Sequence, residues 1–411
     1  MYSRRLVQTL LATVVIALVS VSSSAAEKQT KLISEIEFKD PNFKSCVLES
    51  NYTSVNEIVK LDCKDRGIRD VSEIKLFKNI KSLELSLNEL EEIDVAHNKE
   101  LIYLFLNGNE LGSIDVSENV KLIALSCGKN RLSNLFVGSN INLEMLVVDE
   151  NSISDLDLRT NVNLELFSSR GNSLSMLDLS RNSQLQKLYL YEDDISVIDL
   201  SKNNLLLELS IGGAALTWLD LSHNFLLEVL EVRVNNLKRL DISKSFIIKK
   251  IYIVNGMLEN IDLLKFDSLK ELAVVNNMLR SIDLSGNTLL EYLDLNGNNL
   301  KRLDLANNPI LATVHVNDNS LEYLNVSNNF VLVELRANNN RLKNVDFSRN
   351  IDLEYVELRG NELERLDVSN LEKILYFAAN NNSFQEVLIN ANSDIASFDL
   401  DEGVAVKKVE K

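Results

Sequence analysis

The chain has 411 residues, of which 45% are hydrophobic and 25% are charged, and its formal net charge at pH 7 is -17. This negative charge opposes binding to phosphate backbones, so nucleic acid is not expected as a partner, and anionic membrane surfaces are disfavoured as well. With only 2 prolines and 13 glycines, no long Pro- or Gly-rich linker divides the chain into separate domains.

Residues 1–26 have the features of a secretory signal peptide. Arg4 and Arg5 form a basic start, and an apolar run follows over 10–21. This run is too short to span a bilayer comfortably, and cleavage after Ala26 or the preceding alanine fits the rule of small residues at the cleavage site. We therefore expect a secreted or periplasmic protein that is not stably inserted in a membrane once the signal is removed. An uncleaved membrane anchor is the alternative.

Residues 27–57 are expected to cap the N-terminal end of the fold, because the first turn of a stacked structure would otherwise expose a strand edge and an apolar core. The apolar candidates for covering that end are Ile36, Phe38, Phe43, Val47 and Leu48. An irregular first repeat follows over 58–79. The side chains that we expect to point inward there are Ile58, Leu61, Cys63, Ile68 and Val71.

Three cysteines occur in the chain: Cys46, Cys63 and Cys127. Cys46 and Cys63 lie near each other in sequence and outside the regular repeats, so in an oxidising compartment we expect them to form a disulfide. Cys127 occupies an apolar position of the repeat and is expected to be a buried free thiol. No cluster has metal-ligand spacing, and we expect neither a metal site nor a cofactor.

From residue 80 onward the sequence repeats every 21 residues without an insertion, over fifteen units (80–394) and a remnant with a tail (395–411). One unit reads Leu101-x-x-Leu104-x-Leu106-x-x-Asn109-x-Leu111, followed by Ile114-Asp115-Val116-Ser117-x-Asn119. The units begin at Ile80, Leu101, Leu122, Leu143, Leu164, Leu185, Leu206, Leu227, Ile248, Leu269, Leu290, Leu311, Leu332, Leu353 and Ile374. Positions in a unit are numbered from these residues below.

The first half of the unit is the leucine-rich-repeat signature, and the sequence resembles secreted bacterial leucine-rich-repeat proteins with short repeats, of which the internalins are the best known. The resemblance covers nearly the whole mature chain, and the segment around Pro41 is similar to their N-terminal cap. It implies a curved right-handed solenoid with a parallel β-sheet on the concave face. We expect little or no helix on the convex face, because 21 residues leave little room for one, and we expect residues 401–411 to fray.

Two polar columns run through the repeats. The asparagine at position nine, as in Asn88 and Asn109, ends each strand, and its amide is expected to bond backbone groups of its own and the neighbouring turn. The aspartate at position fifteen, as in Asp115 and Asp157, has two interpretations. It caps a backbone N–H in the turn, or it contributes to a ladder of calcium sites, although one carboxylate per turn supplies few of the ligands that calcium needs.

The concave sheet is the expected binding surface, because repeat proteins commonly bind there. Outward positions in its first two thirds carry aromatic, aliphatic and arginine side chains of the kinds enriched at interface hot spots. The alternative is that such residues simply pair well across strands. Our partner-binding candidates are Tyr103, Phe105, Val147, Arg170, Tyr189, Tyr191, Arg233 and Tyr252. The repeat is least regular in this region, where Phe136, Ser169, Asp193 and Ala214 replace consensus residues.

Catalysis finds no support in the sequence. The three histidines, His97, His223 and His315, lie far apart along a rod-like fold, and no serine sits in a nucleophile-elbow context. We therefore predict a recognition protein, not an enzyme, that binds a protein partner such as a host or neighbouring-cell surface protein. Binding of a glycan or cell-envelope polysaccharide is the alternative hypothesis, with sugars stacking on exposed tyrosines.

Overall fold

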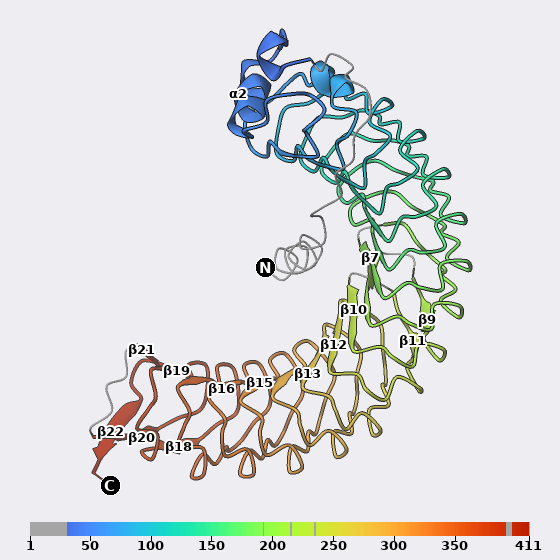
Figure 1. The fold of residues 1–411 in the computed structure, drawn as a ribbon. Helices are drawn as coiled ribbons and strands as arrows, with labels where there is room; N and C mark the ends of the chain where they lie inside the picture. The colour runs from blue at the N-terminus through green and yellow to red at the C-terminus, as the bar shows by residue number, and fades with distance from the viewer. Residues whose placement is uncertain (1–30, 192, 214–215, 234–235, 392–396, 411) are drawn as a thin grey trace.

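The computed structural model describes residues 31–191, 193–213, 216–233, 236–391 and 397–410. These residues form a leucine-rich-repeat solenoid whose turns follow one another along an arc, with the N-terminal helices at one end and the last strands at the other (Figure 1). The predicted signal peptide, residues 1–26, lies outside the described residues.

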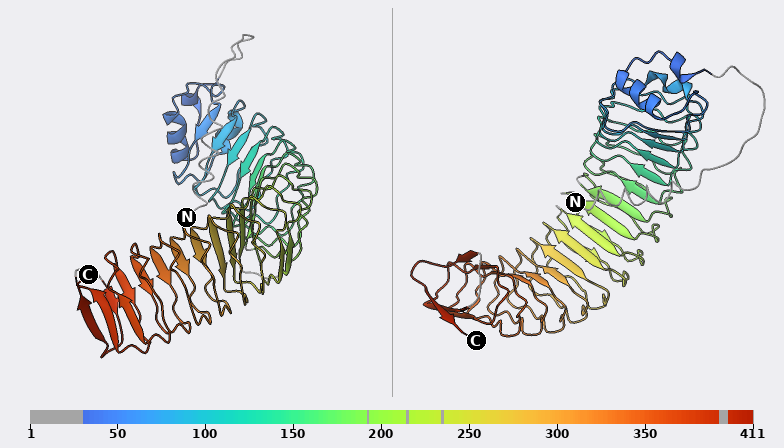
Figure 2. Two further views of the ribbon diagram at one scale, coloured as in Figure 1. Left: turned by 90° about the horizontal axis from the view of Figure 1, so that it is seen from below. Right: turned by 60° about the vertical axis from the view of Figure 1, so that its left-hand side comes forward.

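The inner side of the arc is a parallel sheet with one strand from each turn (Figure 2). Hydrogen bonding follows chain order. Its strands are β1 (Lys60–Asp62), β2 (Ser82–Glu84), β3 (Tyr103–Phe105), β4 (Ala124–Ser126), β5 (Met145–Val147), β6 (Leu166–Ser168), β7 (Lys187–Tyr191), β8 (Glu208–Gly212), β10 (Val229–Arg233), β12 (Lys250–Val254), β13 (Glu271–Val275), β14 (Tyr292–Asp294), β15 (Thr313–His315), β16 (Glu334–Arg336), β17 (Tyr355–Glu357), β19 (Tyr376–Ala378) and β21 (Ser397–Asp399).

The outer side consists of turns and extended segments with very little helix, as the short repeat predicted. Described helices are confined to the N-terminal end, where η1 (Ile33–Glu35), α2 (Pro41–Glu49) and η2 (Ser72–Leu76) lie. Short strands also form on the other side of the coil from the main sheet. They are β9 (Trp218–Asp220) with β11 (Arg239–Asp241), and β18 (Arg365–Val368) with β20 (Glu386–Asn390) and β22 (Ala405–Val409).

The core is one continuous column of aliphatic side chains. Leu101, Leu104, Leu106 and Leu111 of a typical unit are fully buried, and the equivalent residues of the next turn stack on them. Each buried leucine contributes roughly 1.5–3 kcal/mol. A single turn cannot bury its own apolar face, so stability comes from stacking turns on each other.

Two asparagine columns satisfy backbone groups that the bends leave unpaired. At position nine, Asn109 donates to the carbonyls of Leu85 and Leu106, both at 3.0 Å, and accepts from the Leu90 N–H at 3.1 Å. At position nineteen, the fully buried Asn119 donates to two carbonyls of the preceding turn. The first column matches the prediction. The second column also belongs to the repeat consensus, although no role was predicted for it.

The aspartates at position fifteen cap the following turn. Asp115 accepts a hydrogen bond from the Ser117 N–H at 2.9 Å, and Asp283 accepts one from Ser285 in the same way. These hydrogen bonds lower the pKa of both carboxyls. The backbone interpretation therefore accounts for this column, and the described residues contain no group of three or more His, Cys, Asp or Glu side chains that could hold a metal ion.

At the N-terminal end, helix α2 packs against the first turns. Asp40 accepts hydrogen bonds from the first N–H groups of α2, which places the buried Phe43 against the core. A disulfide joins Cys46 to Cys63, with Cα atoms 5.6 Å apart. This confirms the predicted pairing. Cys127 is a buried free thiol, as expected, and burial raises its pKa to about 12.

The C-terminal end differs from the expectation in one respect. The tail predicted to fray contains β22, which pairs in parallel with β20 over five residues. This strand is almost entirely exposed, including Val406, so it has no buried apolar positions by which the sequence would have predicted it. Backbone pairing with the preceding turn holds it instead.

Candidate functional site

The predicted partner-binding residues share one face of the main sheet. At position five, the parallel register aligns Phe105 of β3, Val147 of β5, Tyr189 of β7 and Tyr252 of β12 in a single row, with one residue of each intervening strand between them. At about 4.8 Å per strand, Phe105 and Tyr252 lie some seven strands apart. The candidates therefore form an extended stripe, not one cluster.

The best-defined contact within this stripe joins Arg170 and Tyr189. The Arg170 guanidinium carbon lies 5.1 Å from the centroid of the Tyr189 ring. The Tyr189 hydroxyl donates to a carboxylate oxygen of Glu208 at 2.6 Å, and Lys187 pairs with the other oxygen at 2.8 Å. Burial, followed by the hydrogen bond to Glu208, raises the pKa of Tyr189. These contacts hold the ring in place before any partner arrives.

Arg170 is also anchored by an acid of the preceding turn. The Arg170 side chain forms a salt bridge with Asp149 at 3.5 Å, and the Arg170 backbone N–H donates a hydrogen bond to the same carboxylate at 3.0 Å. Ser168 donates its hydroxyl to Asp149 as well. The arginine is thus held between an acid on one side and an aromatic ring on the other.

The remaining candidates extend the stripe along the arc. Tyr191 follows Tyr189 in β7, and the register places Gly212 of β8 between Tyr191 and Arg233 of β10. A Cβ on Gly212 would clash with the Arg233 carbonyl, so glycine is required for this close approach. Arg233 pairs with Glu231, and the Tyr252 hydroxyl donates to Glu271. Charged neighbours therefore surround the aromatic rings.

One candidate offers less surface than the sequence suggested. Phe105 exposes only 8% of its area, whereas Tyr103 in the same strand is partly exposed. Its cross-strand neighbours, Glu84 and Ser126, lie directly beside it in the closely packed row. The side chain therefore packs within the sheet surface more than it projects from it.

Asp193 is a buried acid beside the stripe, at position nine of the unit that contains β7. It accepts from the Leu174 N–H at 3.1 Å, as the asparagines of this column do. Its second oxygen is buried and, among the described residues, has no hydrogen-bond partner. Burial is the main cause that raises its pKa to about 7, with Asp149 and Asp194 adding to the effect. The substitution is visible in the sequence, but the unpaired oxygen follows only from the burial of this position.

A charged network that the sequence analysis missed occupies the C-terminal third of the concave face. His315 lies between Glu334, at 3.0 Å, and Asp294, at 3.8 Å. The pairs continue from Glu334 to Arg336 and from Glu357 to Arg359, which also reaches Asp399 at 3.2 Å. Position five carries four titratable side chains in consecutive turns, Asp294, His315, Arg336 and Glu357, and this run was the available signal.

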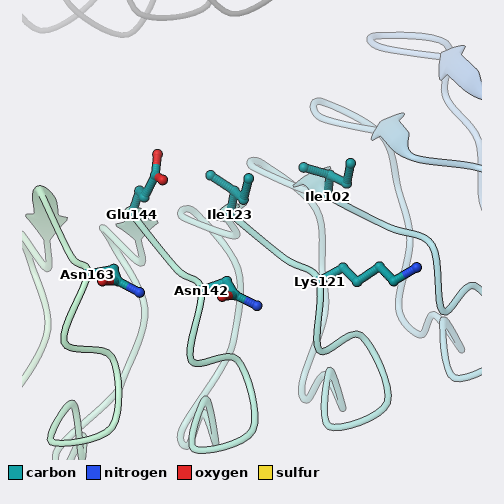
Figure 3. A pocket seen from close by; sticks show the side chains of 6 residues that line it. All are labelled: Ile102, Lys121, Ile123, Asn142, Glu144 and Asn163. Carbon is teal, nitrogen blue, oxygen red and sulfur yellow. The ribbon is translucent and has the colours of Figure 1, made fainter. Parts of the chain in front are cut away.

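A shallow hollow of about 250 Å³ lies on the flank of the solenoid. Figure 3 shows two rows of side chains from successive turns. The lining residues are Ile102, Ile123 and Glu144 in one row and Lys121, Asn142 and Asn163 in the other. The side chains lie in parallel and do not converge on one point, so the hollow offers no arrangement for acid–base or nucleophilic chemistry.

No helix among the described residues is long and apolar enough to cross a membrane.

Comparison with solved structures identifies the architecture. The chain is similar to the functional domain of InlJ from Listeria monocytogenes, with a TM-score of 0.82 and 26% identity over 88% of this chain and 82% of that one. It is also similar to the internalin InlF of the same species, with a TM-score of 0.65 and 19% identity over 79% of this chain and 97% of that one.

A plant peptide hormone receptor, RGFR1, solved in complex with RGF2, shares the fold with a TM-score of 0.55 and 20% identity, over 79% of this chain and 66% of that one. No protein-family model matches the sequence, and no curated protein matches it. The fold is thus that of the internalin-like leucine-rich-repeat proteins.

Proposed function

We propose that the chain is a secreted or cell-surface recognition protein that binds a protein partner through its concave face. Export would follow from the N-terminal segment 1–26, whose basic start, apolar run and small residues are typical of a signal peptide. Leucine-rich-repeat proteins include receptors such as RGFR1, solved in complex with RGF2, and this fits a binding role better than a catalytic one.

The observation that carries the proposal is the anchored pair of Arg170 and Tyr189. An aromatic ring stacked by an arginine and hydrogen-bonded to Glu208 loses little conformational freedom when a partner docks. Tyrosine and arginine also contribute most of the binding energy in many protein interfaces. Rigid docking on a preformed surface is the mechanism that this arrangement favours.

Binding of a glycan is the second candidate function. The stripe offers Tyr191 and Tyr252 for stacking on sugar rings, with Glu231 and Glu271 beside them as hydrogen-bond acceptors. A glycan array separates the two candidates, because saturable binding to a defined sugar would favour this alternative over a protein partner.

The experiment that tests the proposal is affinity capture with the immobilised mature chain, residues 27–411, followed by measurement of the dissociation constant for each captured protein. Replacing Tyr189 and Tyr191 together by alanine is expected to weaken binding by about 30-fold or more, since hot-spot side chains contribute 2 kcal/mol or more. The matched control is Tyr355→Ala, an exposed tyrosine on the same sheet far from the stripe.

Thermal unfolding of all three proteins shows whether the variants remain folded. A captured protein that binds the double variant and the wild type with equal affinity would count against the stripe as the binding surface.

A further inference from the structure

The outer side of the solenoid carries an apolar row at position thirteen of three consecutive turns. Met176, Val197 and Trp218 are 79%, 77% and 55% exposed. Elsewhere this position is polar except at Tyr323. The other residues of the column are Glu92, Ser113, Asn134, Asp155, Arg239, Asn260, Ser281, Arg302, Asn344, Arg365 and Glu386. Three large apolar side chains in adjacent turns, in a column that is otherwise polar, indicate a surface that something covers.

Local backbone geometry places this row beside an acidic one. In β9, Trp218 and Asp220 point outward while Leu219 between them is buried. The two outward residues lie about 6.6 Å apart along the strand. Asp178 and Asp199 hold the same position in the two preceding turns. Each aspartate accepts a hydrogen bond from an N–H of its own turn, as Asp199 does from Ser201. Such hydrogen bonds lower the pKa of Asp178 and of Asp199.

The surroundings of the acidic row are asymmetric. On the side of the apolar row away from the acids, the neighbouring side chains are the uncharged Ser175, Ser196 and Thr217. Basic side chains also border this surface: Arg159, paired with Asp157 at 2.7 Å, acts on Asp178 as well, Lys202 acts on Asp199, and Arg239 lies beside Trp218 in β11. The carboxylates nonetheless form a continuous row along one edge of the apolar side chains, and a partner's basic residues would have to compete with these neighbours for them.

We propose that the row of Met176, Val197 and Trp218 is a second interaction surface, and that its partner is a protein segment forming an amphipathic helix with lysine or arginine along one edge of its apolar stripe. Strand β9, which holds Trp218, pairs in register with β11 of the following turn, so these two turns lie about 4.8 Å apart. This spacing is close to the 5.4 Å pitch of an α-helix. A helix lying along the row would place one apolar residue on each turn and its basic residues on the aspartates.

The net charge of -17 would help to attract such a segment. Figure 1 shows β9 and β11 on the outer side of the arc, away from the concave strands. The two surfaces are thus independent of each other, and both could be occupied at the same time.

The test uses two synthetic helical peptides, one of leucine and lysine and its twin with glutamate in place of lysine, each titrated into the full chain. Trp218 is the only tryptophan, so its fluorescence reports on the row directly. We expect a saturable blue shift with the lysine peptide and none with the glutamate peptide.

Val197→Asp separates this proposal from unspecific attraction. The substitution adds a negative charge at an exposed position, so attraction by charge alone would strengthen binding, whereas docking on the row would weaken it by at least tenfold. The matched control is Tyr323→Ser, which changes the same column five turns away, where the side chain is 57% exposed.

Isothermal titration calorimetry measures all variants on the same scale. Undiminished binding to Val197→Asp, equal binding of both peptides, or no saturable binding of the lysine peptide would each overturn the proposal. The variant lacking Tyr189 and Tyr191 is expected to bind the lysine peptide as the wild type does, which keeps this result separate from the concave face.

Discussion

Asn172 and Asp193 hold the same position in consecutive turns, yet their side chains are in different chemical situations. The Asn172 amide donates to the Val148 carbonyl at 3.0 Å and accepts from Ile153. Asp193 accepts the equivalent hydrogen bond from Leu174, but an oxygen takes the place of the donating nitrogen and has no partner among the described residues. Only the protonated acid can donate there, and burial favours that form.

Asp193→Asn is therefore expected to stabilise the protein at neutral pH. The folded-state pKa of Asp193, about 7, lies above its unfolded value near 4. The contribution of this carboxyl to the stability of the wild type is therefore fully present below pH 4 and is lost as the pH rises through 7. The gain of the variant should be small at pH 4 and reach roughly 3–4 kcal/mol above pH 7. Urea unfolding across this pH range measures it.

The reverse substitution, Asn172→Asp, serves as the control, since it should introduce the same loss with rising pH. Parallel stability curves for the wild type and Asp193→Asn would contradict the assignment.

At the scale of the strand and its turn, the repeat pattern predicted most of what the structure contains. Alternation around Leu104 and Leu106 indicated the strand β3, and the asparagine at position nine indicated its end. The consensus did not predict the five-residue strands β7, β8, β10, β12 and β13 in the middle of the arc. Of the five turns that hold these strands, those of β10 and β13 keep asparagine at position nine, so departures such as Asp193 and Gly256 do not by themselves account for the longer pairing.

The outward residues of the strands were harder to predict than the inward ones. All inward side chains meet the same apolar interior. A leucine at an inward position of the repeat is therefore enough to predict that it is buried. How much of Phe105 is exposed, and which groups anchor Arg170, depend on side chains of the neighbouring turns. The sequence of one repeat does not tell how close those side chains come or with which residues they align. The network around His315 was missed for the same reason.

His315 gives this network a measurable pH dependence. Burial alone would lower its pKa, but the neighbouring carboxylates of Asp294 and Glu334 outweigh that effect and raise it above the ordinary value of 6.5. Protonated His315 therefore contributes stability that is fully present below pH 6.5 and is lost as the pH rises through the folded-state pKa. The stability difference between the wild type and His315→Ala should shrink over that range in chemical denaturation.

His223 offers the control, because it is exposed on a turn. A difference between the wild type and His315→Ala that stayed constant from pH 5 to 9 would rule out a charged His315 in the network.

At the scale of the whole molecule, the uninterrupted 21-residue period and the buried aliphatic column produce a single arc with two distinct sides. The sequence was sufficient to predict this architecture, because each turn buries the same set of apolar positions against its neighbours. It was less informative about function, since the solenoid provides a large surface and the partner recognises only part of it. The concave stripe and the convex row stand out by their departure from the repeat.

Hydroxyl-radical footprinting of the chain, alone and bound to a captured protein partner, tests the central claim of concave recognition most directly. The tyrosines serve as internal probes on both sides of the arc. We predict that oxidation of Tyr189, Tyr191 and Tyr252 falls several-fold in the complex, while oxidation of Tyr323 on the outer column stays unchanged. Protection of Tyr323 with no change at the three concave tyrosines would contradict the account.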